Sequence, residues 1–255
     1  MSHFLEGLQV LTTRPEQQAT RLVAPLQKAG IEVTNIPLLA IQPLTLTPQE
    51  RQGLLDLDHF QKVVVISPSA AQLLLEKLDD YWPQWPVGVD WFTVGAGTAS
   101  LLEQAGLSVQ FPASGDKSED LLQLPALQEL SGEKLLLVKG QGGRPLLEAT
   151  LVSRGAQVRV LELYTRVRPR LNQQQLQALN SDVYQAVVIT SGEALQQYIE
   201  FTEEVDKKRP LLLPSYRLEK QARELGFTRA INTGGAGADA ILAGLKSLDP
   251  GCHPS

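Results

Sequence analysis

The sequence has few of the residues that most often bind metals or act as nucleophiles in proteins. Of its 255 residues one is a cysteine, Cys252, three are histidines, and only 5% are aromatic. A single cysteine leaves no disulfide framework and no cysteine cluster for a metal. Because His3, His59 and His253 are scattered along the chain, we do not expect a histidine metal site or a Cys/His or Ser-His-Asp nucleophile system. Any enzymatic chemistry is expected to use neither a metal nor a cofactor.

Long apolar runs and an excess of positive charge are also missing. No apolar run approaches the roughly 18 residues of a membrane span, and the first residues lack the segments of an export signal. The chain carries 23 Lys and Arg against 28 Asp and Glu, a net charge of -5, whereas a protein that neutralises many phosphates is usually basic. We therefore expect a cytoplasmic protein without a membrane or nucleic-acid partner.

The strongest positive signal is an internal duplication. Gly30 and Val33 recur as Gly155 and Val158 at an offset of 125, within two segments that each run from an apolar strand to a helix. Three further units follow in the same order twice: residues 63–71 match 187–195 at an offset of 124, and 92–106 and 118–122 match 212–226 and 238–242 at an offset of 120. Each unit has a short apolar strand, a polar turn and a helix of period 3.6.

This alternation predicts a doubly wound α/β fold, with two flavodoxin-like domains built on parallel sheets. Two extended, proline-terminated segments at about 36–43 and 160–168 each precede a polar helix, and they could pair as a two-stranded antiparallel hinge. In that case domain 1 would comprise 1–37 plus 168–255, and domain 2 would be the inserted 38–167. A plain tandem division near residue 125 contains the same units and stays open.

Two glycine-rich turns lack the spacing of nucleotide sites. Residues 95–100 follow a strand and open a helix, but Ser100 stands where a dinucleotide loop has its third glycine. Residues 139–145 are glycine-rich and basic without the P-loop spacing. The first turn therefore disfavours a Rossmann oxidoreductase, and the second disfavours nucleotide hydrolysis.

Several turns after the strands carry Ser, Thr or Gly at the expected start of a helix. Helix N-termini present unpaired N–H groups and the positive end of a dipole, so together these turns suit a ligand with several carboxylates or phosphates. For any one turn, helix capping alone explains the residues. In two facing domains such turns would line an interdomain cleft. They span residues 12–14, 67–69, 95–98, 139–144, 191–192 and 214–215.

The order and spacing of these motifs resemble the uroporphyrinogen-III synthases of tetrapyrrole and heme biosynthesis. The matching segments cover nearly the whole chain; they are 13–15, 37–43, 66–71, 94–99, 118–122, the glycine-rich loop after 135–138, 163–167 and 190–192. The resemblance implies the inserted-domain architecture with its hinge. The segment 214–218 departs from the family pattern, in which a Gly-x-x-Thr-Ala turn is expected, and this weakens the assignment of Ser215.

The resemblance also implies a reaction, the cyclisation of linear hydroxymethylbilane with loss of water and inversion of ring D. Loss of hydroxide from ring A gives an azafulvene, ring D attacks it to form a spirocycle, and cleavage with reclosure gives uroporphyrinogen III. Tyr164 falls on the family's interdomain tyrosine and is the candidate proton donor. Arg14, Lys139 and Arg144 are the candidates for the substrate's carboxylates. The remaining candidate contacts are Ser67, Ser69, Thr98, Gly140, Gly142, Ser191, Gly192 and Ser215.

The same residues suit a second class of protein, a hinged two-domain module that binds a small polyanion without catalysis. We expect a monomer whose partner is the small-molecule substrate. A transient contact with the enzyme of the preceding pathway step stays open.

Overall fold

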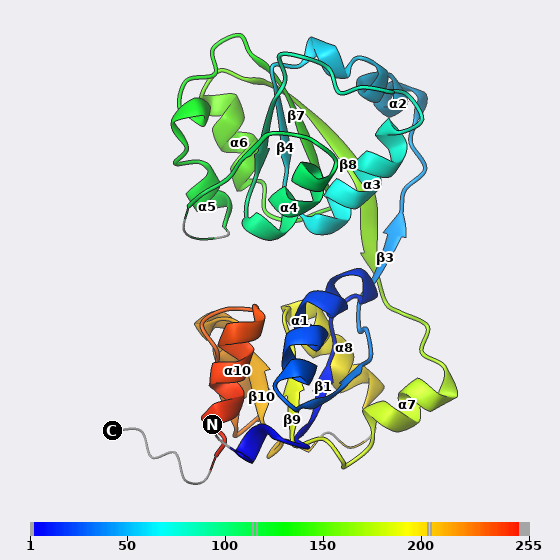
Figure 1. Cartoon of the computed structure of the whole chain (residues 1–255), viewed down its shortest axis with the longest axis vertical. Coiled ribbons are helices and arrows are strands. Elements are labelled where there is room, and N and C mark those ends of the chain that lie inside the picture. The colour runs from blue at the N-terminus through cyan, green and yellow to red at the C-terminus, as the bar shows by residue number, and fades with distance from the viewer. Residues whose placement is uncertain (1–2, 114, 116, 203, 205, 250–255) are drawn as a thin grey trace. The chain divides into compact units, whose positions relative to one another are not determined.

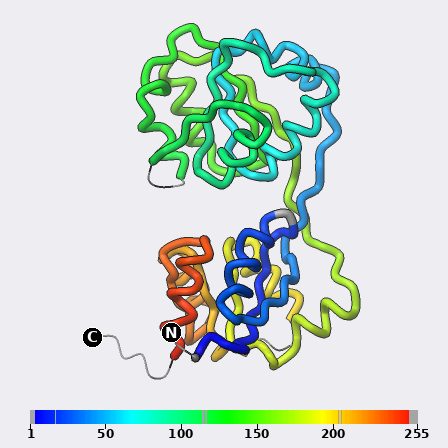
Figure 2. The backbone as a smooth tube through the Cα atoms, in the orientation of Figure 1, coloured from blue at the N-terminus to red at the C-terminus, as the bar shows by residue number. Residues whose placement is uncertain are grey.

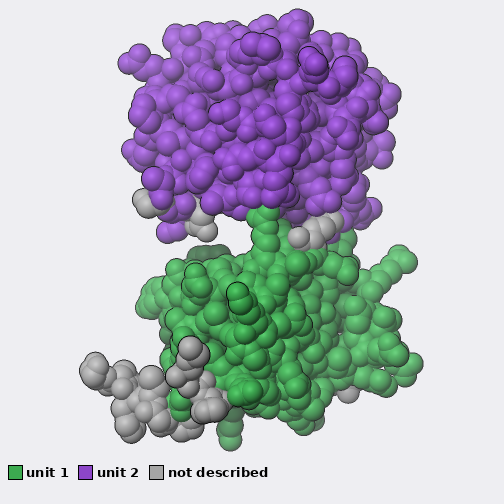
Figure 3. All heavy atoms as spheres, viewed as in Figure 1, with its two compact units in different colours: residues 1–40, 167–255 green, residues 41–166 purple. Residues whose placement is uncertain are grey.

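The computed structural model describes residues 3–113, 115, 117–202, 204 and 206–249. The chain divides into two compact units, unit 1 with Met1–Ala40 and Val167–Ser255 and unit 2 with Ile41–Arg166 (Figure 3). Figure 2 shows that the early and the late parts of the chain fold into one unit and the middle into the other. The chain therefore crosses between units twice, near Ala40 and near Val167.

Unit 1 contains a five-stranded sheet of order β11-β10-β9-β1-β2, and each pair of neighbours in it is parallel. Its elements are η1 (His3–Leu5), β1 (Gln9–Thr12), α1 (Glu16–Lys28), β2 (Glu32–Asn35), α7 (Gln173–Leu179), β9 (Ala186–Val188), α8 (Gly192–Phe201), β10 (Leu211–Leu213), α9 (Tyr216–Glu224), β11 (Ala230–Asn232) and α10 (Ala238–Lys246).

Unit 2 contains a six-stranded sheet of order β3-β8-β7-β4-β5-β6, parallel from β8 to β6. At its edge, Leu44 N donates to Leu163 O at 2.9 Å, and Figure 1 shows β3 and β8 running in opposite directions. Its elements are β3 (Ala40–Pro43), α2 (Pro48–Leu55), η2 (Leu57–His59), β4 (Lys62–Val65), α3 (Pro68–Leu78), β5 (Asp90–Thr93), α4 (Ala96–Gln104), β6 (Val109–Gln110), α5 (Ser118–Leu121), η3 (Pro125–Leu127), β7 (Lys134–Gly140), α6 (Leu146–Ser153) and β8 (Gln157–Val167).

The strand pairings confirm the duplication. The order β2-β1-β9-β10-β11 in unit 1 corresponds to β8-β7-β4-β5-β6 in unit 2. The last two strands of unit 2, β7 and β8, thus take the places that β1 and β2, the first two strands of the chain, have in unit 1. Val10 pairs with Val33, and Leu135 pairs with Val158, which is the same pair displaced by 125 residues. The other corresponding pairs are Leu11–Val187 with Leu136–Val63, and Val188–Leu212 with Val64–Phe92.

Each sheet is covered by helices on both faces, as the continuous apolar strands predict. Along β4, Val63 and Val65 lie in a core with α3, whereas Val64 points to a second core with α5 and α6. In unit 1, Leu11 packs with α8 and α9, and the adjacent Val10 packs with α1 and α10. This alternation buries both faces and leaves the ends of the strands for polar turns.

Two local predictions need correction. Strand β7 runs through Gly140, so Lys139 and Gly140 belong to the strand and not to the turn that follows it. The helix that the repeat predicts from Ser118 is a single turn, α5, whereas its counterpart α10 has nine residues. Within the described part of the chain, no helix is long and apolar enough to cross a membrane.

Gly244 allows α10 to pack closely against the sheet. A Cβ atom there would lie 2.7 Å from Thr233 Cγ2 and 3.0 Å from Leu212 Cδ2. We expect Gly244→Ala to lower the free energy of unfolding by about 1–3 kcal/mol because of overpacking, although alanine is the better helix former. The matched control is Gly235→Ala shortly before the same helix, where φ is not positive and a Cβ would lie at an ordinary contact distance of 3.5 Å from Ala240 Cβ. Equal midpoints in urea for both variants would contradict the close packing.

Candidate functional site

The candidate site residues gather at the carboxyl edge of each sheet, because every turn that follows a parallel strand lies there. The offset of 124 that relates β4 to β9 places Ser67 and Ser191 at equivalent positions. Each is the N-cap of the next helix. Ser67 Oγ accepts a hydrogen bond from Ala70 N, and Ser191 Oγ accepts one from Ala194 N, both at 3.1 Å. Ser215 caps α9 in the same way. Capping therefore occupies one side of each hydroxyl and leaves its hydrogen able to donate.

The two units also carry equivalent cations. The offset of 125 that relates β1 to β7 places Arg14 at the position of Lys139. The Arg14 guanidinium donates from Nη2 to Ala236 O, and its burial lowers the pKa of this group without making it neutral at physiological pH. Lys139 Nζ lies 3.8 Å from Glu162 Oε1, and its side chain is only 12% exposed. Each carboxyl edge thus holds one largely covered positive charge.

Asn35 is a polar neighbour of Arg14 that the sequence did not single out. It closes β2 directly opposite Thr12 in the parallel pairing, and its Nδ2 donates to Arg14 O at 3.3 Å. Among the described residues, Thr12 Oγ1, Arg14 Nε and Asn35 Oδ1 are buried polar atoms without a hydrogen-bond partner. Buried polar groups are normally satisfied, so this corner of unit 1 is suited to a polar group of a ligand. The signal available in the sequence was an asparagine at the carboxyl end of a strand.

The first polar turn does not cap a helix, which corrects the interpretation of residues 12–14. Thr12 and Thr13 are buried, and Thr13 Oγ1 donates to Val188 O at 3.2 Å. Helix α1 begins after Pro15, which makes no side-chain cap. Thr13 therefore fastens the end of β1 to β9, whereas Thr12 Oγ1 and Arg14 Nε have no hydrogen-bond partner at this edge.

Tyr164 lies within unit 2 against two other predicted residues. Its hydroxyl is 3.0 Å from Ser67 Oγ, and either atom can donate. A Cβ atom on Gly140 would come within 2.4 Å of the tyrosine ring, so only glycine permits this contact. A register shift after Lys139 pairs Gly140 with Tyr164, and Gln141 N donates to Tyr164 O at 2.7 Å. The structure shows that Gly140 makes room for the phenol, and its predicted contact with a substrate stays a prediction.

Arg144 has a carboxylate partner within its own unit. It donates from Nη1 and Nη2 to the two carboxylate oxygens of Glu119, at 2.7 and 3.3 Å. This two-pronged hydrogen bond is the main cause that lowers the pKa of Glu119. Both side chains are exposed. Gly142 has a φ of 78°, which favours glycine, and a Cβ there would meet nothing within 4 Å.

The remaining candidates are less accessible. Ser69 in α3 and Thr98 in α4 are buried, so their side chains belong to the packing beneath the edge. Gly192 begins α8, and a Cβ there would lie 3.2 Å from Gln221 Oε1. Ligand contacts of these three residues stay predictions. Within the described ranges, no cluster of three or more His, Cys, Asp or Glu side chains could hold a metal.

The contact between Ser67 and Tyr164 can be isolated by a double-mutant cycle. We expect Ser67→Ala and Tyr164→Phe to show a coupling of about 0.5–1.5 kcal/mol in the free energy of unfolding, because each removes the same hydrogen bond. The control cycle pairs Ser191→Ala with Tyr164→Phe, since Ser191 is an equivalent cap in the other unit, and it should give no coupling. A coupling of similar size in both cycles would refute a specific contact.

The pair of Arg144 and Glu119 makes a pH-dependent contribution. Because the folded-state pKa of Glu119 is lowered, the stabilisation is present above the unfolded pKa of about 4.3 and is lost as the pH falls through the folded value. In Arg144→Ala we expect the pKa of Glu119 to rise, as measured by NMR titration of its carboxyl carbon. Lys117→Ala removes only the weakest contributing charge and should leave the titration almost unchanged. An unaltered Glu119 titration in Arg144→Ala would exclude the pair in solution.

Known proteins match this chain over almost its full length. A profile of the family described as uroporphyrinogen-III synthase HemD matches residues 20–242. Uroporphyrinogen-III synthase of Escherichia coli K12 is 33% identical over 94% of this chain and 100% of that protein. The enzyme of Salmonella typhimurium LT2 is 31% identical, with the same coverage of both chains.

Solved structures share the fold. The uroporphyrinogen-III synthetase of Helicobacter pylori 26695 superposes with a TM-score of 0.64 at 15% identity, over 94% of this chain and 99% of that one. A mutant uroporphyrinogen III synthase of Thermus thermophilus gives a TM-score of 0.58 at 17% identity, over 95% of this chain and 99% of that one. These matches confirm an α/β fold with two domains that contain parallel sheets. The profile and the relatives show that the chain belongs to the uroporphyrinogen-III synthase family.

Proposed function

We propose that this protein cyclises hydroxymethylbilane to uroporphyrinogen III with inversion of ring D. The observation that carries the proposal is the match to uroporphyrinogen-III synthases that covers 94% of this chain and the full length of the relative. The enzyme is a cyclising lyase of porphyrin biosynthesis that works without a cofactor. This reaction suits a chain with so few nucleophilic side chains, because the substrate supplies the reactive carbon atoms.

The proposed reaction begins at the hydroxymethyl group of ring A. Protonation of this hydroxyl releases it as water and leaves a cationic azafulvene. The carbon of ring D that carries the bridge to ring C attacks that methylene carbon and forms a spirocycle. The bond between this carbon and the bridge then breaks. The bridge carbon forms a new bond to the free carbon on the other side of the ring D nitrogen. The pyrrole loses a proton as the ring closes, which balances the proton used at the start. The protein must hold rings A and D together and favour this route over direct closure to the type I isomer.

We propose that Tyr164 supplies the first proton through Ser67. Tyr164 is 2% exposed, whereas Ser67 is only partly buried, so the serine is the more accessible end of the pair. Their 3.0 Å separation allows Ser67 to donate to the substrate while it accepts from the phenol. The phenol is the group proposed to give up its proton along this contact. Ala70 N, which already donates to Ser67 Oγ, holds the serine in place.

Carboxylates of the bilane are proposed to bind at the carboxyl edges of the two units. Arg14 and its equivalent Lys139 provide one charge from each unit. Arg144 can join them when a substrate carboxylate replaces Glu119, since both partners of that pair are exposed. Charge-assisted hydrogen bonds of this kind suit a polycarboxylate. The remaining proposed contacts are Ser69, Thr98, Gly140, Gly142, Ser191, Gly192 and Ser215.

We further propose that the two compact units are the family's two domains. The chain passes between them in β3 and at the end of β8, and these strands are neighbours in one sheet. Two adjacent strands that carry both crossings are suited to act as a hinge. The proposed boundaries are 1–37 plus 168–255 and 38–167, close to the division by contacts at residues 40/41 and 166/167.

Isomer analysis tests the proposed reaction. The purified protein is given fresh hydroxymethylbilane without metal or nucleotide, and the oxidised porphyrins are separated by chromatography. We expect predominantly the type III isomer. If a folded protein yields only type I, the product of spontaneous closure, the proposed reaction is refuted and the hinged module that binds a polyanion without catalysis becomes the leading hypothesis.

The proton relay predicts matched effects in the same assay. Tyr164→Phe should lower the rate about a hundredfold, the lower end of the range for a general acid, with the type III isomer retained. Ser67→Ala should lower it by a similar factor, and the double variant should be no slower than either, because all three break one relay. Tyr81→Phe, elsewhere in unit 2, serves as the control. An unchanged rate in Tyr164→Phe would remove the tyrosine from the mechanism.

A further inference from the structure

Unit 1 has a cavity at the edge of its sheet opposite the candidate site. The cavity has a volume of about 540 Å³, and residues that precede β1, β9, β10 and β11 line it. In a parallel sheet these positions are the amino ends of the strands, whereas Arg14, Ser191 and Ser215 follow the carboxyl ends. The cavity is therefore separate from the residues assigned to the bilane. Its volume is in the range of sites for small organic ligands.

Part of the cavity lining, called the apolar floor below, consists of Phe4, Leu8, Tyr184, Pro210 and Leu248. Leu8, Tyr184 and Pro210 are buried, and Phe4 and Leu248 are partly buried beside them. These side chains come from four segments of the sequence that the fold of unit 1 brings together. An apolar surface of this kind favours a ring or a hydrocarbon body over a small inorganic ion.

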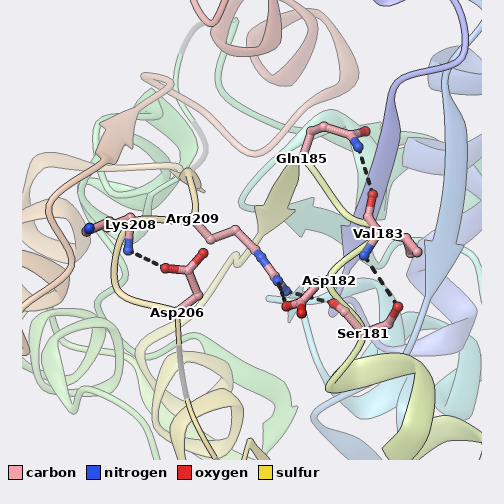
Figure 4. Close-up of polar contacts among 7 residues, drawn as sticks. All are labelled: Ser181, Asp182, Val183, Gln185, Asp206, Lys208 and Arg209. Carbon is pink, nitrogen blue, oxygen red and sulfur yellow. Dashed lines mark hydrogen bonds and ion pairs between the residues drawn. The ribbon is translucent and has the colours of Figure 1, made fainter.

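Three cations and two carboxylates surround this floor. Figure 4 shows Arg209 between Asp182 and Asp206. Arg209 is 8% exposed; it donates from Nη1 to Ser181 O at 3.1 Å and from Nη2 to Asp182 Oδ1 at 3.0 Å. Lys208 and Arg229 also line the cavity and are exposed. The lining therefore carries one more positive than negative charge.

The ion pair between Arg209 and Asp182 is unusual in its exposure. The guanidinium is nearly covered by the protein, but the side chain of its carboxylate partner is 99% exposed. An exposed carboxylate loses little when it turns into water, whereas the covered guanidinium needs a partner. A ligand carboxylate that entered the cavity could therefore take the place of Asp182.

We propose that this cavity binds an organic anion in which a carboxylate is attached to an apolar ring body. The ring lies on Leu8, Tyr184 and Pro210, and the carboxylate is held by Arg209 with help from Lys208 and Arg229. This binding activity is separate from the proposed cyclisation, because it uses the opposite edge of the sheet.

Naphthalene-1-acetate is a suitable probe, and naphthalene-1-acetamide is its neutral counterpart of nearly the same shape. Isothermal titration of the full chain should give saturable binding of the acetate, with a Kd on the order of 0.1–1 mM for a ligand of this size. The acetamide should bind about tenfold more weakly, because it lacks the charge that the three cations recognise. Equal affinity for both compounds, or no saturation by the acetate at millimolar concentrations, would overturn the proposal.

Two variants should change the affinity in opposite directions. Combined Lys208→Ala and Arg229→Ala should weaken acetate binding about fivefold, because it removes two exposed charges. Asp182→Asn should strengthen acetate binding about threefold, because it removes the competing carboxylate and keeps the shape of the side chain. Neither change should alter binding of the acetamide.

Lys220→Ala is the matched control, since Lys220 is an exposed cation of the same unit that does not line the cavity. It should leave the affinity unchanged. Formation of the type III isomer by the double variant should also be unchanged, which shows that the fold is intact and that the two sites are independent. If both the double variant and Asp182→Asn bind the acetate with wild-type affinity, the acetate binds elsewhere and the proposal is refuted.

Discussion

Parallel hydrogen bonding between buried strands is the constraint on which the candidate site depends. Helices cover both faces of each sheet, so polar side chains can gather only at the ends of the strands. Parallel pairing then brings all the turns that follow strands to one edge. Because the two sheets share the same register, that edge is built twice with the same parts. Arg14 and Lys139 are one such pair of equivalent residues, and the caps Ser67 and Ser191 are another.

The two edges differ where chemistry is proposed. In unit 1, β2 ends at Asn35, opposite the last residue of β1. In unit 2, β8 continues to Val167, and a one-residue shift in its pairing with β7 sets Tyr164 beside Gly140. The phenol thereby reaches the N-cap of α3, where Ser67 accepts from Ala70 N and remains able to donate. Duplication thus accounts for two sets of proposed binding groups, and the longer strand in one copy accounts for the proposed proton donor.

Much of the fold could be predicted because equivalent single residues in the two halves of the sequence reveal the repeat. Gly30 and Gly155 both have a positive φ, and Val33 and Val158 occupy the same register position, so the offset between them predicts the strand pairing. The extent of β7 could not be predicted, because Lys139 and Gly140 look like turn residues and their place in the strand depends on contacts with β8. Glu119 and Asn35 were missed for a similar reason. Each is an ordinary polar residue, and its importance arises from a partner distant in the sequence.

The two edges of unit 1 are suited to anions by different physical means. At the carboxyl edge, helices begin, and their first N–H groups and dipoles attract negative charge even where side chains are neutral, as at Ser191 and Ser215. At the amino edge helices have ended, and carbonyl groups that follow a helix, such as Ser181 O, attract cations instead. An anion can bind there only through side-chain charge. This is why the cavity needs Arg209, held by that carbonyl, and why a removable carboxylate such as Asp182 can control access to it.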